Sequence, residues 1–480
     1  MMKYFGLIIC VFLINDNFSQ GTFEAELNFS SSDESANILQ NVEGNYTFAG
    51  TVLNGTNMWD FAVSTMDSAG NILQSNAYGT NLSEYANYII QLPDAGYAVV
   101  GYVQNSTKDV LVIRLDQNGN LIWSNTYANP DDDYARKVIL TDDGDLCVLA
   151  SSYSQNISTS VAYVLRIDLS GNLIWSNTYE FTYNSRVKDI VFDNNGDYIA
   201  AGVNGIYGLL MKLDKTNGTV IWSNNYGTSP GAASWSSVVS TNDGGYLLAG
   251  ENSGIGAGVK DISLMKTNSV GAMEWFKAYG GVNDETNVQL IPFDNSYIVS
   301  AATESFGSGL EDGLIMNVSS EGALLWSKTY GNVQDNSIVS LIKTTDNGLL
   351  FSGNTTPSLG GSPAIWLEKL NILAASSCSN NSVNQTVTIG TPVESSSLPT
   401  VFSGGSAVPF SINTNVIIPS MIFPCPYEVS ESSKYQKVLG TSAADGESSI
   451  TEAFDGGLFV CSSFASGPFG DYDFFVSRLN

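Results

Sequence analysis

One short sequence, NLIWSNTY at residues 120–127, returns in close copies along the chain at intervals of about fifty residues. A fixed period of this size is typical of a repeat architecture, in which one supersecondary unit buries its apolar face only by stacking on its neighbours. The pattern therefore predicts one large repeat domain. The copies are NLIWSNTY at 172–179, TVIWSNNY at 219–226, AMEWFKAY at 272–279 and ALLWSKTY at 323–330.

Each repeat contains four short segments with the pattern of β-strands, which we name strands a, b, c and d. In the second repeat they are residues 85–92, 97–101, 110–116 and 120–127. Apolar and polar residues alternate in them, and β-branched and aromatic residues are frequent. Asp-Gly and Asn-Gly pairs between them favour tight hairpin turns. The repeat thus predicts an all-β fold of four-stranded antiparallel sheets.

The two ends of the repeat region indicate how the domain closes. Residues 23–29, FEAELNF, match only strand d, and residues 474–479, FFVSRL, match only strand c. The first strand is therefore expected to complete the last sheet and join the ends of a ring. Counted in this way, the sequence predicts an eight-bladed β-propeller of four-stranded antiparallel blades over residues 21–480, closed by the N-terminal strand joining the last blade.

A tryptophan recurs in strand d and is expected to pack between adjacent blades. Burying such a ring removes roughly 150–250 Å² from water, which is a large hydrophobic contribution for one residue. A row of tryptophans is also able to stack on a ligand, but core packing is the simpler interpretation. The residues concerned are Trp123, Trp175, Trp222, Trp275 and Trp326.

Residues 371–434 interrupt the repeat in what would be the seventh blade. They follow a strand c pattern at 365–370, and a strand d pattern resumes only at 435–440. The segment is rich in Ser, Thr, Val and Pro, and its alternating run at 385–389 predicts a small β element. The segment is consistent both with an insertion that carries function and with an insertion that the fold tolerates without any function.

Residues 1–20 have the pattern of a signal peptide, with Lys3 before a short apolar run that is too short to span a bilayer. We therefore expect a secreted or cell-surface protein without membrane insertion. In an oxidising compartment Cys378 and Cys425 are expected to form a disulfide within the insertion. Cys147 and Cys461 lie in apolar strands and are expected to be buried free thiols.

Composition excludes several classes of function. The sequence has 47 Asp and Glu against 19 Lys and Arg, a formal net charge of -28, so nucleic acid and anionic membranes are not expected partners. Histidine is absent. Catalytic triads with histidine and histidine-ligated metal sites are therefore excluded.

The DGGY turn, the strand ending in Ala-Gly, the K-L-D or R-L-D strand and N-G-x-x-x-W followed by Y-G together resemble a broad class of secreted and surface propeller repeats. Asp214, Gly218 and Trp222 are also similar in spacing to the tryptophan-docking motif of eight-bladed quinoprotein dehydrogenases. The adjacent cysteines of those enzymes are absent from this sequence. The resemblance therefore implies a propeller scaffold without the quinone site, and we expect no cofactor of that kind.

Acidic residues gather in the loops between strands d and a, on the face where propellers usually bind ligands. Carboxylate oxygens suit Ca²⁺, so calcium is a possible ligand, although such residues also serve as strand caps. Paired carboxylates about 5–9.5 Å apart are also the groups that hydrolyse glycosides. The candidates are Asp131, Asp132, Asp133, Asp284 and Glu285.

Several Asn-x-Ser/Thr triplets recur in the loops between strands b and c and in the insertion. In a eukaryotic secretory route they are candidate glycosylation sites, but a chain rich in Asn, Ser and Thr also produces such triplets by chance. The candidates are Asn54, Asn105, Asn156, Asn354, Asn380 and Asn384.

These features predict an exported, non-enzymatic β-propeller that acts as a binding or structural module at or outside the cell surface. Its expected partner is an extracellular protein or a glycan, and self-assembly is open. The alternative is a propeller hydrolase or lyase that acts on carbohydrate through carboxylates of the loop-bearing face.

Overall fold

The computed structural model describes residues 22–479 with gaps at 31–32, 54–57, 155–158, 228–230, 357–363, 372, 376–379, 383–385, 390–392, 397–398, 404–405, 417–419, 423–444, 453–457 and 467–470. It contains two compact units, Phe23–Tyr427 and Glu428–Asn480 together with Met1–Thr22. The predicted signal peptide lies outside the described residues. Within the described part of the chain, no helix has the length and hydropathy needed to cross a bilayer.

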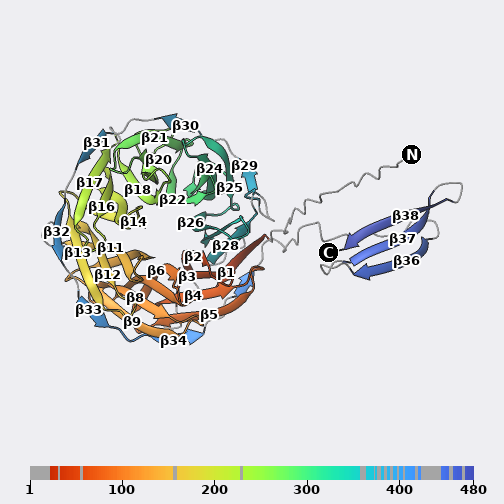
Figure 1. The fold of residues 1–480 in the computed structure, drawn as a ribbon, viewed down its shortest axis with the longest axis horizontal. Coiled ribbons are helices and arrows are strands. Elements are labelled where there is room, and N and C mark those ends of the chain that lie inside the picture. The colour runs from red at the N-terminus through yellow and green to blue at the C-terminus, as the bar shows by residue number, and fades with distance from the viewer. Residues whose placement is uncertain are drawn as a thin grey trace, which may run out of the picture. The chain divides into compact units, whose positions relative to one another are not determined.

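The larger unit is a β-propeller whose seven blades form a ring (Figure 1). In each blade four antiparallel strands follow the order a, b, c, d from the centre outward, which confirms the predicted all-β fold and blade topology. The prediction of eight blades is wrong. Residues 445–479, expected to form the eighth blade, make a three-stranded sheet of their own.

Every blade contributes one strand to each of the four positions. Strands a, at the centre, are β2 (Asp33–Gln40), β6 (Ser83–Gln91), β10 (Asp133–Leu140), β14 (Ser185–Phe192), β18 (Ala233–Ser240), β22 (Glu285–Phe293) and β26 (Asn336–Lys343). Strands b are β3 (Tyr46–Leu53), β7 (Tyr97–Gln104), β11 (Leu146–Ser154), β15 (Tyr198–Asn204), β19 (Tyr246–Asn252), β23 (Ser296–Thr303) and β27 (Leu349–Thr355). Strands c are β4 (Trp59–Met66), β8 (Lys108–Leu115), β12 (Thr159–Ile167), β16 (Tyr207–Leu213), β20 (Asp261–Thr267), β24 (Asp312–Ser319) and β28 (Ala364–Leu370). Strands d are β5 (Ile72–Gly79), β9 (Leu121–Ala128), β13 (Leu173–Glu180), β17 (Val220–Gly227), β21 (Met273–Gly280), β25 (Leu324–Tyr330) and, for blade seven, β1 (Phe23–Asn28).

The N-terminal strand β1 closes the ring as strand d of blade seven. It pairs antiparallel with β28, with Phe23 opposite Lys369 and Leu27 opposite Ile365. Closure by the N-terminal strand is therefore confirmed, but the expected partner at residues 474–479 is wrong. Because β1 occupies the strand d position of blade seven, residues 435–440 are not needed there, and they lie outside the described residues.

Residues 380–422, which we call the belt, give every blade a short fifth strand instead of forming a local insertion in blade seven. The belt strands pair antiparallel with strand d of blades six, five, four, three, two, one and seven in that order, so the belt runs around the ring against the order of the blades (Figure 1). They cover backbone edges that would otherwise be open to pairing with other chains. The strands are β29 (Asn380–Ser382), β30 (Thr386–Ile389), β31 (Val393–Ser396), β32 (Thr400–Ser403), β33 (Ser406–Pro409), β34 (Asn413–Val416) and β35 (Ser420–Ile422).

The smaller unit contains an antiparallel sheet of β36 (Asp445–Glu452), β37 (Leu458–Ser466) and β38 (Asp471–Leu479). These strands carry the a, b and c patterns of the repeat in sequence order. The repeat pattern therefore predicts strands correctly at these residues, although the prediction that they belong to the ring is wrong.

The turns between strands c and d show why the Asn-Gly and Ser-Gly pairs recur. In blade two, Asp116 accepts hydrogen bonds from the backbone N–H groups of Asn118 and Asn120, both at 2.8 Å. Gly119 then has φ 71°, a left-handed conformation that costs glycine little. Asp168 makes the same two bonds in the next blade, where Gly171 has φ 86°.

The strand d motif packs each blade against the next, as predicted for the tryptophans. Trp123 Nε1 donates to the Leu169 carbonyl at 3.0 Å, and the indole lies against Gly171, whose missing side chain leaves the space. Tyr127 Oη donates to the Gly171 carbonyl at 2.7 Å. The same interblade tyrosine bond recurs at Tyr78, Tyr179, Tyr226, Tyr279 and Tyr330.

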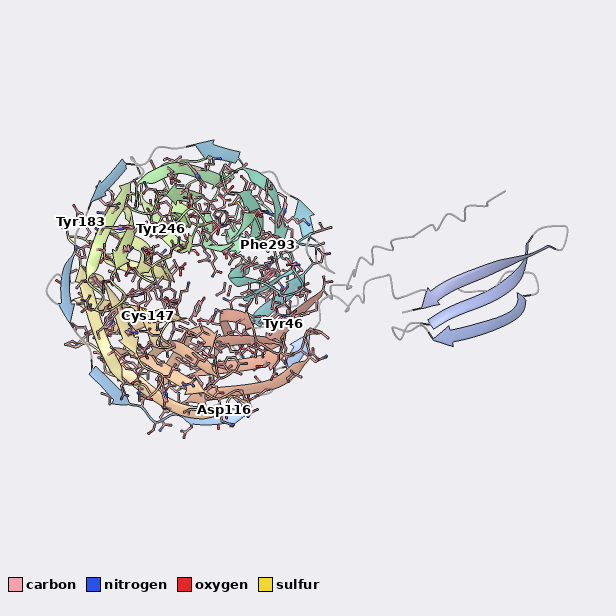
Figure 2. All side chains as sticks on the ribbon, in the orientation of Figure 1. Tyr46, Asp116, Cys147, Tyr183, Tyr246 and Phe293 are labelled. Atoms are coloured by element: carbon pink, nitrogen blue, oxygen red, sulfur yellow. The ribbon has the colours of Figure 1, made fainter. Side chains whose placement is uncertain are left out.

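The predicted buried thiol in blade three is also confirmed. Cys147, labelled in Figure 2, is a free cysteine that packs with Ala200 and Leu209 of blade four. Burial raises the pKa of its thiol to about 12, so it is an inert packing residue at neutral pH. The side chain of Cys461 and the pair Cys378 and Cys425 lie outside the described side chains, so the disulfide stays a prediction.

We predict that Leu27→Ala, in the closing strand, lowers the free energy of unfolding by about 2–5 kcal/mol, because Leu27 is fully buried and its removal leaves a cavity. Leu73→Ala in β5 is the matched control, because Leu73 is 57% exposed, and it should change stability by less than about 0.5 kcal/mol. Denaturant unfolding measures both. Equal small effects would contradict the closing role of β1.

Candidate functional site

The seven inner strands surround a central channel, and each carries a β-bulge near the same place. In blade three the bulge falls between Ala135 and Lys137, and in blade four between Val187 and Asp189. A bulge adds a residue without a partner in the neighbouring strand and re-aims its side chain. Arg136 and Lys188 are therefore set into the channel as the extra residues of their strands.

Side-chain hydrogen bonds next to the bulges join every inner strand to the next one. Between blades three and four, Lys137 Nζ contacts Asp189 Oδ1 at 2.5 Å, and Asp189 Oδ2 in turn accepts from the Val238 N–H of blade five at 2.8 Å. These bonds fix the blades around the channel. The remaining contacts are Ile89 N to Asn37 Oδ1, Asn87 Nδ2 to the Ala135 carbonyl, Ser237 Oγ to the Leu290 carbonyl, Gln289 Nε2 to the Val339 carbonyl, and Ile38 N to Ser340 Oγ.

The channel holds a cavity of about 390 Å³ lined by the inner strands of all seven blades. A second cavity of about 430 Å³ shares Arg136, Lys188, Ser236, Gln289 and Val339 with the first, so the two adjoin. Its other lining residues lie where strands b end and strands a begin. The second cavity is therefore the mouth of the channel on the face that carries the d to a and b to c loops.

Two cations, Arg136 and Lys188, line this mouth on blades three and four, and Arg186 lies near them. The surrounding channel walls and the nearby Arg186 lower the pKa of Arg136. Burial likewise lowers the pKa of Lys188, the carboxylate of Glu251 opposes the shift, and Arg136 and Arg186 add to it. Desolvation by burial is the main cause of both shifts, and repulsion between like charges adds to it. Lys137 differs, since the adjacent Asp189 carboxylate outweighs burial and raises its pKa.

Neutral polar groups complete the mouth. Lys188 Nζ donates to Ser236 Oγ at 3.3 Å, and the amides of Asn287, Gln289 and Asn354 lie around the same cavity. Asn287 has φ 55°, a left-handed conformation within the bulge of β22. Such a mixture of amide, hydroxyl and cationic groups suits a polar, anionic ligand better than an apolar one.

The acidic candidates predicted from sequence are caps of their own loops. Asp133 is buried at the start of β10, where it accepts from the Asn129 N–H at 2.6 Å and from Asn129 Nδ2 at 3.2 Å. Burial raises its pKa to about 6, although the hydrogen bonds from Ser152 and Asn129 oppose this shift. Glu285 occupies the same place in β22, and accepts from Gly281 N and Thr303 Oγ1. Burial raises its pKa as well.

The other acidic candidates bind neighbouring backbone groups. Asp132 accepts from the Lys108 N–H at 3.0 Å and from Tyr134 Oη at 3.1 Å. Asp284 accepts from the Lys260 N–H at 3.1 Å, and Asp131 lies in the same loop as Asp132. The structure therefore divides the five candidates between blades three and six. Among the described residues, no group of three or more Asp, Glu, His or Cys side chains is placed to hold a metal ion.

The candidate glycosylation sites differ in position. Asn105 is exposed in its loop, where its amide binds Asp109 at 2.8 Å. Asn354, expected in a loop, lies in β27, accepts from the Ser35 N–H at 2.9 Å and lines the channel mouth. Asn54, Asn156 and Asn384 lie outside the described residues, and Asn380 is the first residue of β29. Glycosylation stays a prediction.

Sequence reasoning missed the channel cations. Their strands were recognised, but a bulge reverses which side chains face inward, and no motif marks it. The available signal was weak: four cations stand close together in two consecutive inner strands, as ARK at 135–137 and RVK at 186–188, in a chain that is otherwise poor in Lys and Arg.

Comparison with known proteins adds little. No protein-family model and no curated protein matches the chain. Similar solved structures include an α-L-arabinofuranosidase from Fusarium graminearum (12% identity, TM-score 0.42, covering 74% of this chain and 99% of that one) and a protein from Lactobacillus plantarum (11%, 0.42, 78% and 99%). A Hadza microbial sialidase is also similar (9%, 0.37, 72% and 67%). Because the identities and TM-scores are this low, these similarities say nothing about the activity of this chain.

We predict that Glu84→Gln removes part of the pH dependence of stability. Burial raises the pKa of Glu84 from 4.5 to about 7, against the hydrogen bonds from Thr80. The folded state therefore binds this proton more tightly than the unfolded state. The resulting stability is fully present below pH 4.5 and is lost as the pH rises through about 7.

The free energy of unfolding of the wild type, relative to the variant, should thus fall by about 1–3 kcal/mol over that range. Denaturant titrations at several pH values measure the difference. A difference that does not change with pH would contradict the prediction.

Proposed function

We propose that this protein is an exported, non-enzymatic binding propeller that takes its ligand at the mouth of the central channel. The observation that carries the proposal is the convergence of polar side chains from several blades on one cavity at the loop-bearing face. Rigid inner strands hold these groups, so a ligand would bind to a largely preformed site.

The arrangement of the carboxylates favours binding over hydrolysis. Glycoside hydrolysis needs two carboxyl groups that both face the same bond. Asp133 and Glu285 are fully buried and accept hydrogen bonds from their own loops. The hydrolase alternative would therefore need groups other than these caps. Export rests on the predicted signal peptide, and an extracellular glycan or protein is the proposed partner.

The mouth of the channel provides a direct test. Val339 lines both cavities on blade seven, so Val339→Trp should fill the channel without removing a polar group. Val270→Trp is the matched control, because Val270 is 62% exposed on a c to d turn. The measurement is the thermal shift produced by a panel of neutral sugars, sugar acids, amino acids and inorganic anions.

We predict that at least one compound stabilises the wild type and the Val270→Trp variant, and that Val339→Trp abolishes the shift while keeping its own melting temperature within a few degrees. No shift from any compound, or an equal shift in all three proteins, would contradict binding in the channel. Turnover of a glycoside that Asp132→Asn or Asp284→Asn abolishes would support the hydrolase instead.

A further inference from the structure

The cations at the channel mouth stand out because most other strand cations are neutralised. Strand c carries a Lys or Arg that pairs with an aspartate of the a to b turn in the same blade, as Lys212 does with Asp193 at 2.6 Å. Among the described residues, the ion pairs do not include Arg136, Arg186 or Lys188. The equivalent pairs are Arg114 with Asp94, Arg166 with Asp143 and Asp145, Lys266 with Asp243, and Lys369 with Asp346.

The composition of the chain does not explain why these three cations lack ion pairs among the described residues. The chain has 47 carboxylate side chains and 19 cationic ones, so partners for three more cations are abundant. The two carboxylates that line the channel have other partners: Asp189 pairs with Lys137, and Glu251 accepts from the Asn287 N–H at 3.2 Å. Within the described part of the chain, the fold thus holds Arg136 and Lys188 at one cavity without an ion pair, with Arg186 nearby, and Glu251 is the carboxylate that lines the same mouth.

Like charges held together cost stability, and a bound anion offsets that cost. Arg136 is exposed and Lys188 is half-buried, so the channel walls lower the local dielectric mainly around Lys188, where repulsion by other cations and attraction for an anion exceed the values in open water. Arg136 and Lys188 line both adjoining cavities from neighbouring inner strands. An oxyanion bound in either cavity would therefore face two cationic side chains.

Tyrosines of blades two and three lie beside Arg136, outside the residues that line the two cavities. Tyr85 and Tyr102 stack with ring centroids 4.8 Å apart, and Tyr134 meets Tyr102 edge to face at 5.2 Å. Lys108 Nζ lies 4.7 Å from the Tyr134 ring centroid and 3.1 Å from its hydroxyl. The phenols of Tyr102 and Tyr134 are close enough to Arg136 to counter the lowering of its pKa. This half-buried row offers aromatic carbon and hydroxyl groups, which suit a sugar ring.

We infer that the channel mouth binds an acidic sugar, with Arg136 and Lys188 as the residues that bind its carboxylate. The inference rests on the proposed function, since it names the ligand class of the same site. A cavity of about 390 Å³ beside one of about 430 Å³ is large enough for a monosaccharide unit and excludes a folded protein domain.

The test is calorimetric titration of the full-length protein with glucuronate, glucose and inorganic sulfate. Glucuronate and glucose differ only at the carboxylate, and sulfate supplies the charge without the ring. The variants are Arg136→Gln and Lys188→Gln. Lys277→Gln is the control, because Lys277 lies on the outer strand β21 and its removal changes the net charge equally.

We expect glucuronate to bind the wild type and the Lys277→Gln variant, glucose not to bind, and sulfate to bind more weakly than glucuronate. Arg136→Gln and Lys188→Gln should each weaken glucuronate binding by about tenfold, the usual size of one lost charged hydrogen bond. Their melting temperatures without ligand should stay equal or rise, because repulsion falls.

Equal binding of glucose and glucuronate, both abolished by Val339→Trp, would overturn the acidic sugar and leave the channel site intact. No glucuronate binding up to about 10 mM, or binding that neither variant weakens, would also overturn it. The thermal-shift panel with Val339→Trp judges the channel site separately, so the two failures are distinguishable.

Discussion

The pairing of β1 with β28 is the interaction on which the rest of the structure depends. It joins residues 342 positions apart, as in the hydrogen bond from Trp366 Nε1 to Glu24 Oε1. Loop-closure entropy grows only slowly with length, so one buried strand is able to offset the cost. Without it, blade seven would lack its outer strand, and the packing between blades seven and one would lose Phe23, Ala25 and Leu27.

Closure determines the geometry of the channel as well as the number of blades. Each inner strand is bonded to the next through a side chain beside its bulge, and only a closed ring makes this series continuous. Arg136 and Lys188 keep their positions because their neighbours Lys137 and Asp189 are fixed to each other. The belt strengthens the same ring from outside, where Phe410 N donates to the Ser124 carbonyl at 2.8 Å. Closure of the ring is thus required both for the seven-bladed architecture and for the geometry of the candidate site.

Most of each blade could be predicted from sequence because local chemistry determines it. Turns such as the one at Gly119 recur along the chain, and the packing of Trp123 on Gly171 is repeated by Trp175, Trp222 and Trp275 on the glycine of the next blade. The number of blades could not, because IWLEKL in β28 and FFVSRL in β38 offer β1 similar strand c partners. The belt was missed because pairing over such distances has no local signal. The channel cations were missed because a bulge changes which face a side chain takes.

The most direct test of the account is cysteine cross-linking of the closing strand. Glu24 lies opposite Glu368 in the register of β1 and β28, and opposed residues of antiparallel strands are close enough for a disulfide. Ser477 of β38 holds the equivalent strand c position. The account predicts that Glu24→Cys with Glu368→Cys cross-links efficiently under mild oxidation, as mapped by peptide mass spectrometry, whereas Glu24→Cys with Ser477→Cys does not. The opposite result would contradict closure of a seven-bladed ring by β1.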